Sequence, residues 1–218
     1  MIEAIIFDLG GVLVNLDVDR CKKAFVEDVG YRNIGELLDA SHQKGFYSDL
    51  EQGLISDEEF RRRILAGAEP RPGVTDADCS KENAVDHAMW ALLTGVDAYK
   101  IELLRELGKK YDLYLLSNNN GISMVRCRQL FAEAGLPMDS IFRKQFLSYR
   151  MKLLKPSVEI YRRVVSEIGI APEKMLFIDD SRTNIDVASS AGINVLFYPQ
   201  GSDLKTALYT RLEELEKC

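Results

Sequence analysis

Polar side chains follow three expected buried strands of this sequence, and a lysine stands where a helix is expected to begin. These side chains include carboxylates, a hydroxyl, an amide and an amine. Each of three short apolar runs is followed at once by polar residues, and a lysine precedes an expected helix; these residues are Asp8, Ser117-Asn118, Asp179-Asp180 and Lys155. The carboxyl ends of parallel strands meet at one edge of a sheet, where open α/β folds bind their ligands. We therefore expect these side chains to converge.

The chemistry of such a set follows from its charges. Asp8, Asp179 and Asp180 would place three carboxylates in one crevice, which is costly unless a cation lies between them. Oxygen ligands of this kind suit Mg²⁺ completed by water and a substrate phosphate. Lys155 would add a positive charge, and Ser117 and Asn118 would add hydrogen-bond donors. The set indicates a phosphoryl-binding site in which one carboxylate can act as a nucleophile and form an aspartyl-phosphate.

The elements that must position these residues alternate between strands and helices. We expect strands over 111–117, 174–179 and 193–198 besides the first run, and short extended pieces at 141–142 and 145–148. Helices are expected over 98–110, 121–134, 155–169 and 182–191, and a last helix carries Leu204, Leu208 and Leu212 on one face. This alternation predicts an α/β protein with a doubly wound, Rossmann-like parallel sheet.

The segment after the first strand has a different pattern, without strand alternation. Helices are expected over 19–29, from a start at Ser56 with Glu59 as a capping box, and over 81–93, with a loop at 69–75. Arg61, Arg62 and Arg63 are interpreted as a solvated face. We expect an all-helical cap domain over residues 16–94, inserted into a core domain made of 1–15 and 95–218.

Composition narrows the class of protein. The 218 residues are 46% hydrophobic and carry a net charge of −6, which argues against a general nucleic-acid or anionic-membrane binder. No apolar run has membrane-spanning length, and the first residues lack the pattern of a signal peptide. The widely spaced cysteines (Cys21, Cys79, Cys127 and Cys218) are interpreted as free thiols of a reducing compartment. We expect a soluble cytoplasmic protein that acts on a small molecule.

The order Asp8-x-x-Gly11, Ser117-Asn118, Lys155-Pro156, Asp179-Asp180 resembles the haloacid dehalogenase-like hydrolase superfamily over nearly the whole chain. The insert is similar to that family's helical cap placed between its first two motifs. The resemblance implies that Asp8 is the nucleophile and that Lys155 steadies it, while Ser117 and Asn118 bind the phosphoryl oxygens. It implies that Asp8, the Gly10 carbonyl and the acidic pair hold Mg²⁺, with Asp180 favoured over Asp179 as the direct ligand. Asn184 either supports that acidic loop or simply lies on a helix face.

The sequence departs from that family's pattern at Gly10, where most of its phosphatases have a second aspartate for acid–base catalysis. General acid–base help is typically worth about 10²–10⁴ in rate. The Asp-Leu-Gly-Gly variant resembles a branch that includes small sugar phosphatases, whose acidic leaving groups need less protonation. We therefore expect a Mg²⁺-dependent phosphatase acting on a small phosphorylated metabolite such as a hexose 1-phosphate. Asp17 could also supply the missing acid, although a helix-start role explains it more simply.

Two other interpretations stay open. A non-catalytic protein that binds a phospholigand or a partner would explain Gly10, but it leaves the retained Asp8, Ser117 and Lys155 unexplained. A metal-independent 2-haloacid dehalogenase would also lack the second aspartate. The intact pair Asp179-Asp180 argues against it, because two acids without a cation are electrostatically costly.

Overall fold

The structure is a computed structural model that describes residues 1–38, 44–69 and 80–217. A five-stranded parallel sheet forms its centre. Its strand order is β5-β4-β1-β6-β7, so the first strand occupies the middle. The strands are β1 (Ala4–Phe7), β4 (Asp112–Ser117), β5 (Lys144–Leu147), β6 (Met175–Asp179) and β7 (Asn194–Phe197). All four pairings are parallel. The predicted doubly wound sheet is confirmed.

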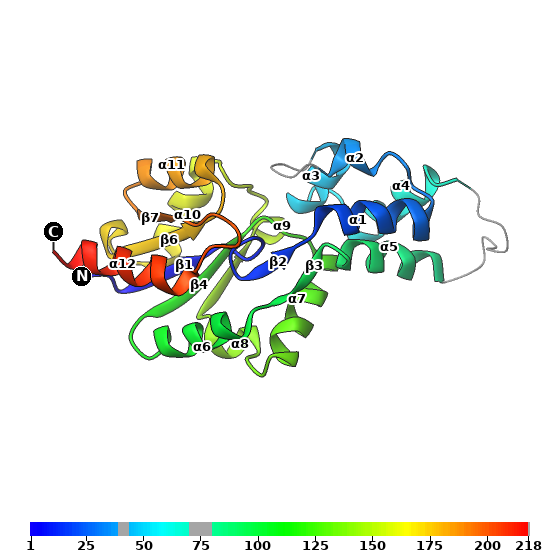
Figure 1. The fold of residues 1–218 in the computed structure, drawn as a ribbon. Coiled ribbons are helices and arrows are strands. Elements are labelled where there is room, and N and C mark those ends of the chain that lie inside the picture. The colour runs from blue at the N-terminus through cyan, green and yellow to red at the C-terminus, as the bar shows by residue number, and fades with distance from the viewer. Residues whose placement is uncertain (39–43, 70–79, 218) are drawn as a thin grey trace.

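Helices cover both faces of this sheet because both faces are apolar (Figure 1). Ile5 and Phe7 of β1 point into one hydrophobic cluster, and Ala4 and Ile6 point into another. The first cluster is completed by α6 (Ala98–Leu107), α7 (Gly121–Glu133) and α12 (Leu204–Glu216), and the second by α10 (Val158–Ile168) and α11 (Arg182–Ser190). The strands β1 and β6 are buried along their whole length. Such strands appear in a sequence as continuous apolar runs, which is why they could be predicted.

A group of helices inserted after β1 lies beside the sheet, toward the right of Figure 1. It consists of α1 (Val18–Ala24), a π-helical turn η1 (Phe25–Val29), α2 (Ile34–Leu37), α3 (Gly45–Glu51), α4 (Asp57–Ala66) and α5 (Ser80–Trp90). Two short strands, β2 (Val14–Leu16) and β3 (Leu93–Val96), pair antiparallel where the chain enters and leaves the group. We propose that this ribbon is the boundary between a core domain and a cap.

Several local expectations differ from the structure. An extended piece was expected at 141–142, but Ile141 is the last residue of the short helix α8 (Met138–Ile141), and only Phe142 is extended. The helix expected from Lys155 begins at Val158, because Ser157 is its N-cap and has a non-helical backbone, with φ −56° and ψ 131°. Between α9 (Ser148–Met151) and β6 lies one further turn, η2 (Pro172–Lys174).

The arginine cluster of α4 is not simply a solvated face. Arg61 forms a bidentate ion pair with Asp86 of α5, with its Nε 2.7 Å from Oδ1 and its Nη2 3.0 Å from Oδ2. Both side chains are less than one-fifth exposed. Arg62 and Arg63 do face solvent and pair with Glu59 of their own helix. The prediction was therefore wrong for Arg61, because a helix pattern alone does not show which neighbour a side chain meets.

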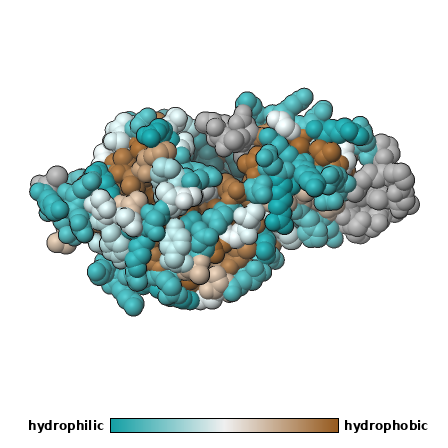
Figure 2. Space-filling view, in the orientation of Figure 1, coloured by the Kyte–Doolittle hydropathy of each residue, from teal (hydrophilic) through white to brown (hydrophobic). Residues whose placement is uncertain are grey.

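Direct contacts join the helical group to the core. The indole N–H of Trp90 donates to the Ile122 carbonyl at 2.8 Å, and Gln52 donates to the Lys152 carbonyl at 3.3 Å. Lys152 in turn donates to the Gly53 carbonyl. On the face shown in Figure 2, hydrophilic side chains cover much of the outer surface, and hydrophobic ones show in patches on both parts and between them.

No helix in residues 1–38, 44–69 or 80–217 is long and apolar enough to cross a membrane. Cys21 and Cys127 are buried free thiols, as expected. Cys79, Cys218 and most of the loop expected at 69–75 lie outside the described residues.

Candidate active site

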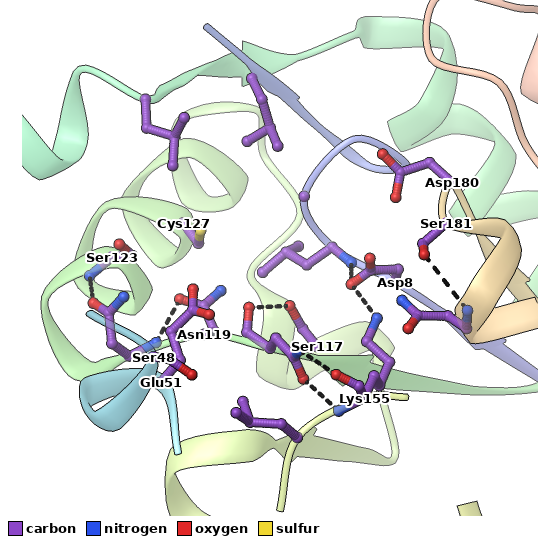
Figure 3. Close-up of a pocket in the computed structure, with 18 of the residues that line it drawn as sticks. Asp8, Ser48, Glu51, Ser117, Asn119, Ser123, Cys127, Lys155, Asp180 and Ser181 are labelled. Atoms are coloured by element: carbon purple, nitrogen blue, oxygen red, sulfur yellow. Dashed lines mark hydrogen bonds and ion pairs between the residues drawn. The ribbon is translucent and has the colours of Figure 1, made fainter. Parts of the chain in front are cut away.

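A cavity of about 500 Å³ lies between the carboxyl edge of the sheet and the helical group (Figure 3). Ligand pockets typically have volumes of 300–1,000 Å³. The core contributes nearly all of the residues that the sequence singled out, namely Asp8, Gly10, Ser117, Asn118, Lys155, Asp180 and Asn184. Asp179 lies directly behind them and is completely buried. The expected convergence at one sheet edge is therefore seen in the structure.

Lys155 is the central cation of the cavity. Its Nζ lies 3.0 Å from Asp8 Oδ1 and 2.6 Å from Asp179 Oδ2, and its side chain is 1% exposed. Burial lowers the pKa of Lys155, but the charges of Asp179 and Asp8 outweigh this effect and raise it. Lys155 is therefore a permanently charged group held against the Asp8 carboxylate.

Both carboxylate oxygens of Asp179 accept hydrogen bonds. Asn184 Nδ2 donates to Oδ1 at 2.9 Å and to Oδ2 at 3.1 Å, and the Ser181 backbone N–H donates to Oδ1 at 2.8 Å. With Lys155 on Oδ2, this carboxylate is fully partnered by protein groups. Of the two interpretations left open for Asn184, the supporting role is the one seen in the structure.

Asp180 is the more accessible member of the acidic pair. Its Oδ2 accepts a hydrogen bond from Gln200 Nε2 at 2.6 Å. Gly11 lies directly against it with φ +79°, and a Cβ at that position would collide with the Asp180 carboxylate and come within 2.5 Å of Gln200 Nε2. The second glycine of the first motif is therefore required for backbone conformation and for close approach.

The acidic residues of the cavity fit a divalent cation. Oxygens of Asp8, Asp179 and Asp180 all lie within 4.8 Å of one another. The pKa of Asp8 is raised to about 7: burial is the largest cause, the charge of Lys155 opposes it, and the charges of Asp179 and Asp180 add to it. Burial also raises the pKa of Asp180. One lysine thus leaves this cluster short of positive charge, and a small oxygen-preferring cation would supply it.

The loop after β4 provides neutral hydrogen-bonding groups. The buried Ser117 hydroxyl donates a long hydrogen bond, 3.3 Å, to the Asn118 carbonyl, its one hydrogen bond among the described residues. The Asn118 side chain is fully used, because its Nδ2 donates to the Lys155 carbonyl at 2.9 Å and its Oδ1 accepts from the Lys155 N–H at 2.8 Å. Asn118 thus ties the Lys155 loop to the sheet, and contact with a phosphoryl oxygen would fall to its backbone.

Some features of the cavity were not anticipated from the sequence. Glu51 and Ser48 of α3 line it from the helical group, and Gln200 after β7 holds Asp180. Asp17 does not line it; its carboxylate caps α1 by accepting from the Arg20 N–H at 2.8 Å. A sequence pattern can show where strands end, but it cannot show which residue of the inserted helices lies opposite those ends. No local sequence signal therefore predicts that Glu51 lines the cavity.

A model of the haloacid dehalogenase-like hydrolases matches residues 2–192. The chain belongs to the haloacid dehalogenase-like hydrolase family. A D-ribitol-5-phosphate phosphatase of Bacteroides thetaiotaomicron is 32% identical to it over 95% of this chain and 97% of its own. A sesquiterpene phosphatase of Aspergillus oryzae is 27% identical over 88% of this chain and 87% of its own.

Solved structures of haloacid dehalogenase-like enzymes have the same fold. An enzyme of B. thetaiotaomicron in complex with magnesium and inorganic phosphate superimposes with a TM-score of 0.84 at 35% identity, over 94% of this chain and 98% of that one. A predicted hydrolase of Porphyromonas gingivalis gives a TM-score of 0.82 at 31% identity, over 97% and 98%. These likenesses place this haloacid dehalogenase-like chain among the hydrolases of phosphoric monoesters.

Proposed function

We propose that this protein is a Mg²⁺-dependent phosphatase that hydrolyses a small sugar or polyol phosphate through an aspartyl-phosphate on Asp8. The observation that carries the proposal is the contact between Asp8 and the buried Lys155, with Ser117 and Asp180 lining the same cavity. A carboxylate held by a fixed cation, with hydrogen-bond donors around it, is suited to attack phosphorus and to stabilise the charge of its transition state.

Each residue has a separate role in this proposal. The Asp8 carboxylate attacks phosphorus opposite the leaving oxygen, and Lys155 neutralises charge on the phosphoryl oxygens while holding Asp8 in place. The Ser117 hydroxyl, whose present contact is long, turns to donate to a phosphoryl oxygen. Water then attacks phosphorus and releases Asp8.

The metal ligands we propose are Asp8, Asp180 and the Gly10 carbonyl. Asp179 is the weaker candidate, because Lys155, Asn184 and Ser181 already occupy its oxygens; it positions Lys155 instead. Mg²⁺ bound there would offset the charge of a phosphate dianion and of the clustered carboxylates.

The substrate class rests on the cavity and on the relatives. A volume of about 500 Å³ with Ser48, Asn119 and Ser123 along its wall suits a small polyhydroxylated compound. The relative that is 32% identical over almost the whole chain acts on D-ribitol 5-phosphate, a primary alkyl phosphate. This supports a polyol or sugar phosphate of similar size at least as well as the hexose 1-phosphate expected from the first motif.

The proposal is tested by phosphate release from D-ribitol 5-phosphate, glucose 1-phosphate and p-nitrophenyl phosphate, with Mg²⁺ and with EDTA. We expect turnover of at least one sugar or polyol phosphate that requires Mg²⁺. Absence of turnover on a wide panel would favour a non-catalytic binding protein. Chloride release from a 2-haloacid that EDTA does not affect would instead indicate a dehalogenase.

A further inference from the structure

Among the described residues that line the cavity, Glu51 is the one acid contributed by the helical group. It is the last residue of α3, and its side chain is half-buried. No hydrogen bond or ion pair joins its carboxylate to any residue in the described parts of the chain. A carboxyl group that reaches a polar cavity without a protein partner is available to a ligand.

The main chain of Glu51 is fixed to the core. The Ser148 hydroxyl, which is completely buried, donates to the Glu51 carbonyl at 2.6 Å and accepts from the Asn119 N–H at 2.9 Å. Asn119 belongs to the loop that carries Ser117 and Asn118. The Glu51 backbone is therefore tied, through one hydroxyl, to the loop that borders the phosphoryl site.

Glu51 also lies on the appropriate side of the cavity for the leaving group. Figure 3 shows Glu51 and Ser48 on one side, Asp8, Lys155 and Asp180 on the other, and Ser117 between them. In-line displacement places the leaving oxygen on the side of phosphorus away from the nucleophile. With Asp8 as nucleophile, that oxygen points toward the helical group, which contributes Glu51.

We propose that Glu51 is the proton donor to the leaving oxygen, the role for which Gly10 has no side chain; this inference rests on the proposed phosphatase function. As the bond from Asp8 to phosphorus forms, the bond from phosphorus to the leaving oxygen breaks, and the Glu51 proton passes to that oxygen. The alcohol departs and water takes its place. Water bonds to phosphorus, the Asp8–phosphorus bond breaks, and the proton of the water returns to Glu51.

The protonation of Glu51 agrees with this role. The pKa of Glu51 is raised to about 8, mainly by burial and further by the charge of Asp8, while the charge of Lys155 opposes the shift. The other charged or titratable groups that line the cavity in the described residues are Asp180, Tyr47 on the same helix and Cys127 of α7. Glu51 is therefore largely protonated at neutral pH, as a general acid must be.

The test compares Glu51→Gln with the unaltered enzyme on leaving groups of different acidity. For D-ribitol 5-phosphate, whose alkoxide is a poor leaving group, we expect kcat/KM to fall by about 10²–10⁴, because a general acid is lost. For p-nitrophenyl phosphate, whose leaving group needs no proton, we expect a change of less than about tenfold. The activity of the unaltered enzyme on the alkyl phosphate should decline as pH rises through the Glu51 pKa. The pH profile of the variant should not show this decline.

Asp49→Asn is the matched control, because Asp49 lies on the same helix and does not line the cavity. It should leave both substrates and the pH profile unchanged. Glutamine mimics protonated glutamate, so the Glu51 variant should melt no lower than the unaltered protein. Equal losses of kcat/KM on both substrates, or a higher KM with an unchanged kcat, would overturn the proton-donor role and indicate a structural or a binding role. If the unaltered enzyme hydrolyses neither substrate, it is the phosphatase function itself that fails.

Discussion

At the scale of single residues, the site depends on one lysine that balances several acids. Lys155 is 1% exposed and touches both Asp8 and Asp179. Two buried carboxylates without a counter-charge are far more costly than an ion pair, because each loses its hydration without a partner. We therefore expect Lys155 to contribute to folding as well as to the proposed chemistry.

Lys155→Met should therefore abolish activity and destabilise the protein. Breaking a buried pair by removing one partner typically costs about 3–5 kcal/mol, which urea unfolding in EDTA would measure. Lys174→Met is the control, because its ion pair with Glu3 has both side chains about half exposed. That substitution should cost less than about 1 kcal/mol. Similar losses in the two variants would show that Lys155 is not the counter-charge described above.

Residues at strand ends were accessible from the sequence, because a buried parallel strand leaves a continuous apolar run whose end is easily seen. Asp8, Ser117 and Asp180 were located in this way and do line one cavity. The partner that each side chain contacts was harder to predict from the sequence. Asn118 hydrogen-bonds the backbone of Lys155, 37 residues away in the chain, and no local pattern carries that pairing.

At the scale of elements, the helices of the inserted group are held together by polar contacts as well as by their apolar faces. Arg61 of α4 and Asp86 of α5 form a two-pronged ion pair that is largely shielded from solvent. Bidentate pairs of this kind are stronger than exposed ones, because both hydrogen bonds are charge-assisted and the geometry is fixed.

A double-mutant cycle on Arg61→Ala and Asp86→Ala, followed by urea unfolding, should give a coupling free energy of about 1–3 kcal/mol. The reference cycle uses Lys205 and Glu106, a pair that joins α12 to α6 with both side chains 45% exposed. Its coupling should stay below about 1 kcal/mol. Equal coupling in the two cycles would mean that shielding from solvent adds nothing to the Arg61 pair.

The order of the core elements was predicted, but short elements were not. The ribbon of β2 and β3 has strands of three and four residues, with a register irregularity after Asn15. Segments this short show no clear period of two. Likewise, the four residues of α8 are too few for a helical period, so an extended piece was expected at Ile141.

At the scale of the whole molecule, the cavity exists because two parts of the chain meet. The sheet edge supplies the charged groups, and the helical group supplies Tyr47, Ser48 and Glu51. Ser148 joins them, since its hydroxyl bridges the Glu51 carbonyl and the loop after β4. The sequence predicted an insert but not the side chains it presents, because the docking of two parts depends on long-range contacts.

Contacts between the helical group and the core also lie beside the cavity. Lys152 and Gln52 join the segment after α9 to the end of α3, next to Glu51, which lines the cavity. A closed site strengthens the electrostatic interactions within it and protects an aspartyl-phosphate from uncontrolled hydrolysis. The arrangement is thus consistent with a covalent intermediate.

The most direct test of the central claim is to look for that intermediate on Asp8. The enzyme is mixed with Mg²⁺ and its best phosphate substrate, quenched in acid within one turnover, and the peptide that contains Asp8 is weighed by mass spectrometry. We predict a transient gain of one phosphoryl group on Asp8, and neither this gain nor turnover in Asp8→Asn. Turnover without a phosphorylated Asp8, or turnover that persists in Asp8→Asn, would contradict the account.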